Sequence, residues 1–293
     1  MTIYASILGG LGNQMFQYAA ARALAHAKGQ ALYLDLNDFT GYRLHHGFEL
    51  TRVFNCPAEV AEQSMLVKLL GWRAYPLARR LLCQPKLAWL RGTQLVVEPH
   101  LKYWPGFFDS PANCYLLGYW QSEKYFINIA DIIRQDFTFR APLSGINCEF
   151  ASQITDSMSV SLHIRRGDYV SDAKTRAIIQ TCSLDYYRNA VNWIADKVAA
   201  PHFFVFSDAI DWAKENLRIP YPCQFISHNR GKDSYIDMHL MSLCKHNIIA
   251  NSSFSWWGAW LNANPRKIVV APHQWFVNKN DVNDLLPQDW VAL

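Results

Sequence analysis

The sequence predicts an α/β protein, and two observations carry this prediction. From residue 158 onward, short apolar strands alternate with helical segments, and the connections between them are short. The first 35 residues show a strand, a glycine-rich turn, a helix and a second strand. Alternation of this kind produces a parallel sheet flanked by helices, so we expect a Rossmann-like half, most regular in the C-terminal part.

Composition narrows the class of protein further. The 293 residues suffice for two domains, and a chain that is 51% hydrophobic and 18% charged is globular. A net charge of +4 is too weak to indicate nucleic-acid binding. The seven cysteines are scattered without paired spacing, so we expect reduced core thiols and no zinc site. The N-terminus lacks the features of a signal peptide, so we expect a cytoplasmic protein.

The N-terminal part is predicted to contain fewer regular elements. Strands are expected at residues 3–8, 31–35 and 116–122, and helices at residues 15–28 and 124–135. Gly29 is expected to end the first helix in a left-handed conformation. The proline and glycine in residues 141–147 indicate a domain boundary, so we expect domains at residues 1–147 and 148–293.

The C-terminal part is predicted to alternate throughout. We expect strands at residues 160–164, 203–207, 224–227, 247–250 and 267–271. We expect helices at residues 184–199, 209–217, 234–244 and 254–261, with Asp237 as a solvated acid.

Polar side chains gather at the ends of three of these strands. Ligands of parallel α/β sheets bind at the carboxyl ends of strands. Guanidinium groups, an acid for ribose or base, and a helix N-terminus together suit a nucleotide diphosphate. The residues concerned are His163, Arg165, Arg166, Asp208, Ser252 and Ser253.

Structural explanations stay open for each of these groups. The arginines could form a solvated pair with Asp168 as their partner, and Asp208 could only cap the following helix. The serines could likewise serve only as a helix cap.

The glycine-rich turn at the N-terminus permits a rival interpretation. Gly10-x-Gly12-x-x-Met15, followed by Asp35, is close to the dinucleotide-binding pattern but lacks its third glycine. A nicotinamide-dependent oxidoreductase is therefore one alternative function, and a tight turn without a ligand is another reading of the same residues. A non-catalytic glycan-binding protein, suggested by the aromatic content, is a third alternative and would bind sugar without nucleotide.

Residues 64–97 form a basic segment without any acidic residue. Its cations lie among Leu, Trp and Tyr, so a face that contacts an anionic membrane or a phosphate-bearing acceptor is one hypothesis. An ordinary solvated basic face is the other. The six cations are Lys68, Arg73, Arg79, Arg80, Lys86 and Arg91.

The motifs that the sequence lacks also bear on the chemistry. It contains no Asp-x-Asp and no phosphate-binding loop of the Gly-x-x-x-x-Gly-Lys-Ser/Thr type. A diphosphate leaving group would then be neutralised by arginine and helix N-termini instead of a carboxylate-held Mg²⁺. We therefore expect group transfer from a nucleotide-activated donor without a metal or cofactor.

The same motifs resemble those of the bacterial α-1,2-fucosyltransferases. Residues 9–18 (GGLGNQMFQY) are similar to the opening motif of this family, and residues 163–169 (HIRRGDY) to the H-x-R-R-x-D motif of several fucosyltransferase families. Residues 206–208 (FSD), 251–261 (NSSFSWWGAWL) and 118–126 (GYWQSEKYF) extend the resemblance along the chain. One departure is Ala209, where family members often carry a second acid.

The resemblance implies a GT-B-like fold of two Rossmann-like halves that face a cleft. It implies metal-independent, inverting transfer of L-fucose from GDP-β-L-fucose to O2 of a terminal β-galactoside. Partners would be GDP-fucose and a galactose-terminated oligosaccharide or lipid-linked glycan, in O-antigen or capsule synthesis. We expect peripheral contact with the inner face of the membrane to involve residues 64–97, if the segment has this function.

The resemblance also implies individual roles. Arg165 and Arg166 would hold the β-phosphate, and Asn13 would lie near the reacting centre. The remaining donor-binding residues would be His163, Asp168, Asp208, Ser252, Ser253 and Phe254. The general base stays open among Asp35, His45, His46, Glu49 and Asp168.

Overall fold

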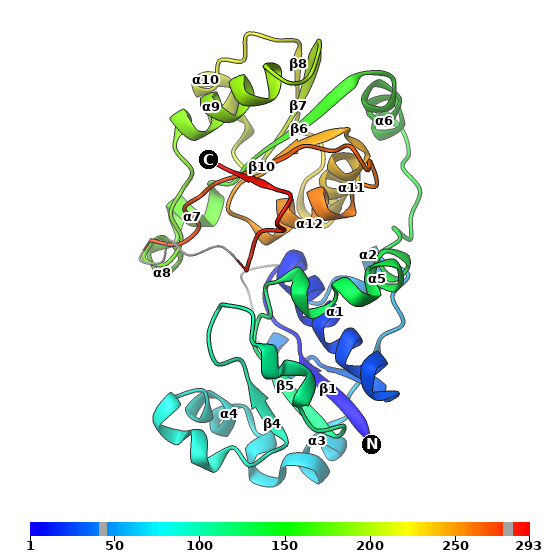
Figure 1. Ribbon diagram of the computed structural model, residues 1–293, viewed down its shortest axis with the longest axis vertical. Coiled ribbons are helices and arrows are strands. Elements are labelled where there is room, and N and C mark those ends of the chain that lie inside the picture. Colours follow the sequence, from blue (N-terminus) through cyan, green and yellow to red (C-terminus); the bar gives the residue numbers. More distant parts are fainter. Residues whose placement is uncertain (41–45, 278–283) are drawn as a thin grey trace. The chain divides into compact units, whose positions relative to one another are not determined.

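The computed structural model describes residues 1–40, 46–277 and 284–293 (Figure 1). His45 lies outside the described residues, and so does the side chain of Asp168. Contacts divide the chain into two compact units, Met1–Arg140 and Ala141–Leu293. The division falls where the proline- and glycine-containing segment 141–147 begins.

The first unit is built on a five-stranded sheet with the order β3-β2-β1-β5-β4. Every pairing in this sheet is parallel. Parallel pairing requires each connection to cross a face of the sheet, and α1 (Leu11–Lys28) packs against β1 and β2. The strands are β1 (Thr2–Ser6), β2 (Ala31–Asp35), β3 (Glu59–Val60), β4 (Leu95–Val97) and β5 (Cys114–Leu117).

Helix α1 begins at Leu11, so the predicted start at residue 15 is wrong. Gly10 is its N-cap and Gly12 lies in its first turn. The prediction excluded Gly12 from the helix because glycine has a low helix propensity. In the structure, burial of Leu11 outweighs this cost. Gly29 ends the helix with φ 62°, as predicted.

The remaining helices of the first unit are short, and several are 3₁₀ turns. The helix predicted at residues 124–135 is wrong in its first part, which forms two 3₁₀ turns before α5. Tyr125 and Phe126 are buried there, and the Tyr125 hydroxyl accepts a hydrogen bond from the Trp104 N–H at 2.9 Å, so tertiary packing interrupts the helical pattern. The elements are η1 (Asn37–Phe39), α2 (Leu50–Val53), α3 (Gln63–Leu70), η2 (Gly71–Ala74), α4 (Pro76–Leu82), η3 (Pro85–Leu90), η4 (Pro105–Asp109), η5 (Glu123–Tyr125), η6 (Ile127–Ile129) and α5 (Ala130–Asp136).

The second unit carries a six-stranded sheet with the order β11-β10-β9-β6-β7-β8. All its pairings are parallel. Strand β9 ends at Ile248, two residues before the predicted end, although the Ile249 N–H still donates to the Val270 carbonyl at 2.9 Å. The strands are β6 (Met158–Ile164), β7 (Pro201–Ser207), β8 (Cys223–Ile226), β9 (His246–Ile248), β10 (Val269–Ala271) and β11 (Val291–Ala292).

Alternating side chains of β7 build the two cores of this unit. Phe203 and Val205 pack with α9 and α10, whereas Phe204 and Phe206 pack with α6 and α11. These helices therefore cover opposite faces of the sheet, as Figure 1 shows. The helices are α6 (Ile146–Asp156), α7 (Gly167–Ser171), α8 (Ala173–Arg176), α9 (Leu184–Ala195), α10 (Ile210–Asn216), η7 (Gly231–Asp233), α11 (Tyr235–Leu243) and α12 (Ser253–Leu261).

Two further properties concern the cysteines and the character of the helices. The seven cysteines are free thiols, but Cys83 and Cys148 are exposed, so the prediction of core thiols is wrong for these two. Among the described residues, none of the helices combines the length and apolar character needed to cross a bilayer.

Candidate active site

The carboxyl ends of β9, β6 and β7 lie side by side in the second unit, because these strands are neighbours in the sheet. His163 lies near the end of β6, and Arg165 and Arg166 follow it. Asp208 follows β7, and Ser252 precedes α12 shortly after β9. The structure thus brings the residues of all three strand ends to one edge.

Asp208 connects the ends of β7 and β6. Its carboxylate accepts hydrogen bonds from the backbone N–H groups of Arg166 at 2.9 Å and Gly167 at 3.0 Å. Its Oδ2 also lies 3.1 Å from Nη1 of Arg165. The structure therefore excludes a mere cap of the following helix as the role of Asp208, because the carboxylate binds the opposite segment.

The close approach of Asp208 depends on Gly167. A Cβ atom at position 167 would lie 2.6 Å from Oδ2 of Asp208. Only glycine leaves room for the carboxylate at the beginning of α7, which explains the glycine after the arginine pair.

The two arginines diverge from one another. The guanidinium of Arg165 pairs with Asp208 and lies 5.6 Å from the centre of the Tyr169 ring. The guanidinium of Arg166 stacks on Trp212 of α10, with Cζ 3.7 Å from the ring centre. Both side chains are half-buried, and these contacts within the protein orient them. Sequence reasoning missed Trp212, because nothing in its local pattern links α10 to β6.

His163 is held in its neutral form. Its side chain is 5% exposed, and burial together with the nearby Arg165 charge lowers its pKa to about 3. Its ring centre lies 5.7 Å from that of Phe254. Its Nδ1 atom has no hydrogen-bond partner among the residues that the structure describes. The imidazole can therefore give or accept a hydrogen bond without carrying charge.

The N-terminus of α12 is anchored by Asn251. The Tyr169 hydroxyl donates to the Asn251 carbonyl at 2.9 Å, and the Asn251 amide donates to the carbonyls of Trp275, at 3.0 Å, and Gln180. Ser252 occupies the N-cap position, but its side chain makes no capping hydrogen bond. The first N–H groups of this helix lack intrahelical partners, as at any helix N-terminus.

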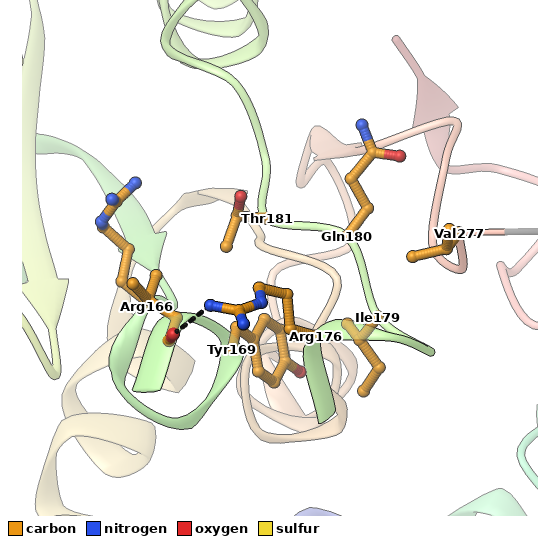
Figure 2. A pocket seen from close by; sticks show the side chains of 8 residues that line it. Arg166, Tyr169, Arg176, Ile179, Gln180, Thr181 and Val277 are labelled. Atoms are coloured by element: carbon orange, nitrogen blue, oxygen red, sulfur yellow. Dashed lines mark hydrogen bonds between the residues drawn. The ribbon is translucent and has the colours of Figure 1, made fainter. Parts of the chain in front are cut away.

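A cavity of about 390 Å³ lies beside these residues. Arg166, Tyr169 and Arg176 contribute to its lining, and Figure 2 shows the Arg166 guanidinium turned away from Arg176. Arg176 donates to the Val170 carbonyl at 3.2 Å. This third arginine was not singled out from the sequence, because only the folding of α7 and α8 brings it near the pair.

Asn13 belongs to the first unit, where Gln121 orients its side chain. The Gln121 amide donates to Oδ1 of Asn13 at 2.8 Å. Gln121 follows Trp120, which is fully buried with φ 55°, a conformation that bulky residues rarely adopt. The Glu98 carboxylate stabilises this turn by accepting from the N–H groups of Tyr119 at 2.7 Å and Trp120 at 3.0 Å.

Two of the candidate general bases are engaged in ion pairs. Asp35 is fully buried, pairs with Arg79 and accepts from the Tyr115 hydroxyl at 2.7 Å. Glu49 is also buried, with Oε1 2.5 Å from Nη2 of Arg52. Asp35 is therefore committed to the core, which removes the acid that the dinucleotide interpretation requires.

Arg79 corrects the interpretation of the basic segment in the same way. It is 2% exposed and pairs with Asp35, so it does not belong to a solvated face.

Asp237 is not the solvated acid that the sequence predicted. Its carboxylate accepts a hydrogen bond from the Asn229 amide at 2.8 Å, and burial raises its pKa to about 7. Among the described residues, no group of three or more His, Cys, Asp or Glu side chains could hold a metal ion.

Comparison with known proteins places this chain in a family. The α-1,2-colitosyltransferase of Escherichia coli is 34% identical over 99% of this chain and 98% of its own length. The O-antigen biosynthesis glycosyltransferase WbnK of Escherichia coli is 32% identical over 99% of this chain and all of its own. The galactoside α-(1,2)-fucosyltransferase 2 of Bos taurus is 25% identical over 87% of this chain and 67% of its own.

The fold has solved relatives as well. The fucosyltransferase NodZ from Bradyrhizobium superposes with a TM-score of 0.55 over 92% of this chain and 94% of its own, at 14% identity. The fold is GT-B-like, an α/β protein with two parallel sheets. The profile of glycosyl transferase family 11 matches residues 105–293. The chain belongs to glycosyl transferase family 11.

Proposed function

We propose that the chain transfers L-fucose from GDP-β-L-fucose, with inversion, to O2 of a terminal β-galactoside during synthesis of a surface glycan such as O-antigen or capsule. The second unit binds the donor and the first unit binds the acceptor. Support for the linkage and the galactoside comes from the α-1,2 relatives, and support for the glycan from the name of WbnK. The cytoplasmic side of the membrane is the proposed location.

The observation that carries the proposal is the oriented pair of guanidinium groups at the end of β6. Arg165 is fixed by Asp208, and Arg166 is fixed by Trp212. In a single displacement, the acceptor O2 forms a bond to C1 of fucose while the bond from C1 to the β-phosphate oxygen breaks. Negative charge then grows on departing GDP, and preorganised cations stabilise it.

The other donor-binding residues have separate proposed roles. Neutral His163 and Phe254 contact the guanosine, and Ser252 and Ser253 place a hydroxyl-lined helix N-terminus near the diphosphate. Asp208 positions Arg165 and the start of α7 on the side of the site that binds the nucleotide. Asp168 remains a proposed contact on the strength of the family motif.

The proton of the acceptor 2-hydroxyl also needs a group to receive it. The O2 proton leaves as the new bond forms, and His46 is an exposed candidate acceptor in the first unit. Asn13, with Oδ1 bound to Gln121, offers its amide N–H groups to an acceptor hydroxyl. We propose that arginine, not a divalent cation, carries the charge of the leaving group, so that turnover continues in EDTA.

A colitosyl donor is the second candidate. One relative at 34% identity is a colitosyltransferase, and colitose is fucose without its 3-hydroxyl. The reacting centre and the leaving GDP are the same for both donors, so the arginine pair does not separate them.

The test is a donor comparison in EDTA. Purified protein is incubated with lactose and either GDP-fucose or GDP-colitose, GDP release is followed, and the product linkage is read by NMR. We expect an α-1,2-linked product with a higher kcat/KM for GDP-fucose. A higher kcat/KM for GDP-colitose selects the second candidate. Binding of lactose without GDP release from either donor would contradict both.

A further inference from the structure

Residues 63–90 of the first unit cover one face of its sheet. The inner side of this layer packs on the sheet side chains Tyr4, Leu95 and Tyr115. Leu66, Leu70, Ala74 and Leu82 form that inner side and are buried. The inner side of the layer is therefore already covered by the core.

The opposite side of the layer is apolar as well. Leu77 and Leu81 of α4 are 76% and 56% exposed, and their spacing of four residues places them on one face of the helix. Tyr75 and Trp72 are 55% and 51% exposed, and Trp89 of η3 is 79% exposed. We call Trp72, Tyr75, Leu77, Leu81 and Trp89 the apolar outer face. Exposed large apolar side chains that are concentrated in one short segment favour an interaction site.

The exposed charges of this segment are all positive. Lys68, Arg80 and Lys86 are exposed, and residues 64–97 contain no acid. The other cations are engaged inside the unit: Arg79 pairs with Asp35. Arg73 donates to the Leu90 carbonyl at 2.5 Å, and Arg91 donates to the Leu82 carbonyl at 2.8 Å. These bonds join η2, α4 and η3, so the outer face belongs to an ordered layer.

Exposed apolar side chains together with exposed cations favour one binding partner for the apolar outer face. In a symmetric dimer through this face, the cations Lys68, Arg80 and Lys86 would face the same set of cations on the second copy, and like charges repel. An anionic bilayer pairs with the cations through lipid phosphates and accepts Trp, Tyr and Leu at its interfacial level. We propose that the apolar outer face docks the first unit onto an anionic lipid bilayer. This docking would hold the enzyme at the surface where a lipid-linked acceptor is presented.

Vesicle sedimentation tests the proposal. The full chain is mixed with vesicles of equal parts phosphatidylglycerol and phosphatidylcholine, and with vesicles of phosphatidylcholine alone. We expect binding to the anionic vesicles that weakens as salt rises. Trp89→Ala and Leu77→Ser should each weaken binding about tenfold, because each removes one large side chain from the lipid contact.

Control variants separate the outer face from general effects. Ile146→Ser removes an apolar side chain of α6 that is 49% exposed in the second unit, and it should bind vesicles like the wild type. Release of GDP with soluble lactose should stay unchanged in Trp89→Ala. Equal vesicle binding by wild type and Trp89→Ala would overturn the proposal. So would a dimer in light scattering that Trp89→Ala abolishes, since the face would then belong to a second copy.

Discussion

At the scale of single residues, the arrangement at the end of β6 depends on a carboxylate that contacts three groups at once. Asp208 binds the backbone at 166 and 167 and pairs with Arg165. A charged acceptor fixes backbone N–H groups more strongly than a neutral one, so the start of α7 is held in place. Asp208 therefore makes all three contacts by itself, although Ala209 stands where family members often carry a second acid.

Arg165→Lys tests whether the fork geometry matters. Lysine keeps the charge but loses the planar fork that binds a phosphate with two hydrogen bonds. We expect kcat to fall by about 10²–10³ with little change in stability, since the interaction is made most strongly with the departing phosphate. Steady-state GDP release gives kcat, and thermal unfolding reports stability.

The control for this prediction is Arg188→Lys. Arg188 is an exposed arginine of α9 that pairs with Asp185 at 3.2 Å. Its replacement should leave kcat unchanged. Near-normal turnover of Arg165→Lys would remove Arg165 from the mechanism.

At the scale of elements, the turn after β5 contains a strained residue, Trp120, next to the Gln121 that binds Asn13. Gly118 has no room for a side chain, because a Cβ would lie 2.4 Å from Cβ of Glu98. Trp120 holds a positive φ of 55° inside the core. Strain of this kind persists where surrounding contacts determine the backbone, and here the Glu98 carboxylate supplies them.

Glu98→Ala should therefore loosen this turn. Two N–H groups would lose their acceptor, so we expect the free energy of unfolding to fall by about 1–3 kcal/mol. KM for the acceptor should rise if Gln121 no longer orients Asn13. Urea unfolding and acceptor titration measure the two effects. Glu149→Ala, an exposed site on α6, is the matched control, and an equal loss there would contradict the assignment.

Asp237 of α11 should make stability depend on pH. Its pKa rises from the usual 3.8 to about 7 in the fold because burial disfavours the charged form. Between these values the folded state binds more protons than the unfolded state, so the free energy of unfolding falls as pH rises, by at most about 1.4 kcal/mol per pH unit.

Asp237→Asn isolates this contribution. The amide keeps the size and the carbonyl acceptor for Asn229 but does not titrate, so urea unfolding at several pH values should show the decline removed. Asp185→Asn alters an exposed carboxylate of α9 and should retain it. A wild-type decline that persists in Asp237→Asn would assign it to another group.

Much of the element pattern could be predicted from the sequence. Strong periodicity located the strands β6, β7 and β10, and the glycine at position 29 located the end of α1. The first unit was harder, because contacts distant in sequence decide its short turns. Arg79 is an example: its neighbours suggest a solvated cation, whereas Asp35 and Tyr115, which pair with it, lie 44 and 36 residues away.

At the scale of the whole molecule, the site was predictable as a list of residues but not as a geometry. Strand alternation alone predicts a parallel sheet whose carboxyl ends share one edge. The order that makes β9, β6 and β7 neighbours at that edge comes from the structure. The divergence of Arg165 and Arg166 does not follow, since Trp212 and Tyr169 direct them apart through contacts across elements.

The central claim is that the strand ends of the second unit bind the diphosphate of GDP. Calorimetric titration of GDP into the wild type, Arg165→Met and the exposed control Arg188→Met, all in EDTA, tests it most directly. We predict that GDP binds to the wild type and to the control with equal affinity, and at least about tenfold more weakly to Arg165→Met, because a charged hydrogen-bond donor is lost. Equal GDP affinity of wild type and Arg165→Met, or binding of NAD in place of GDP, would contradict the account.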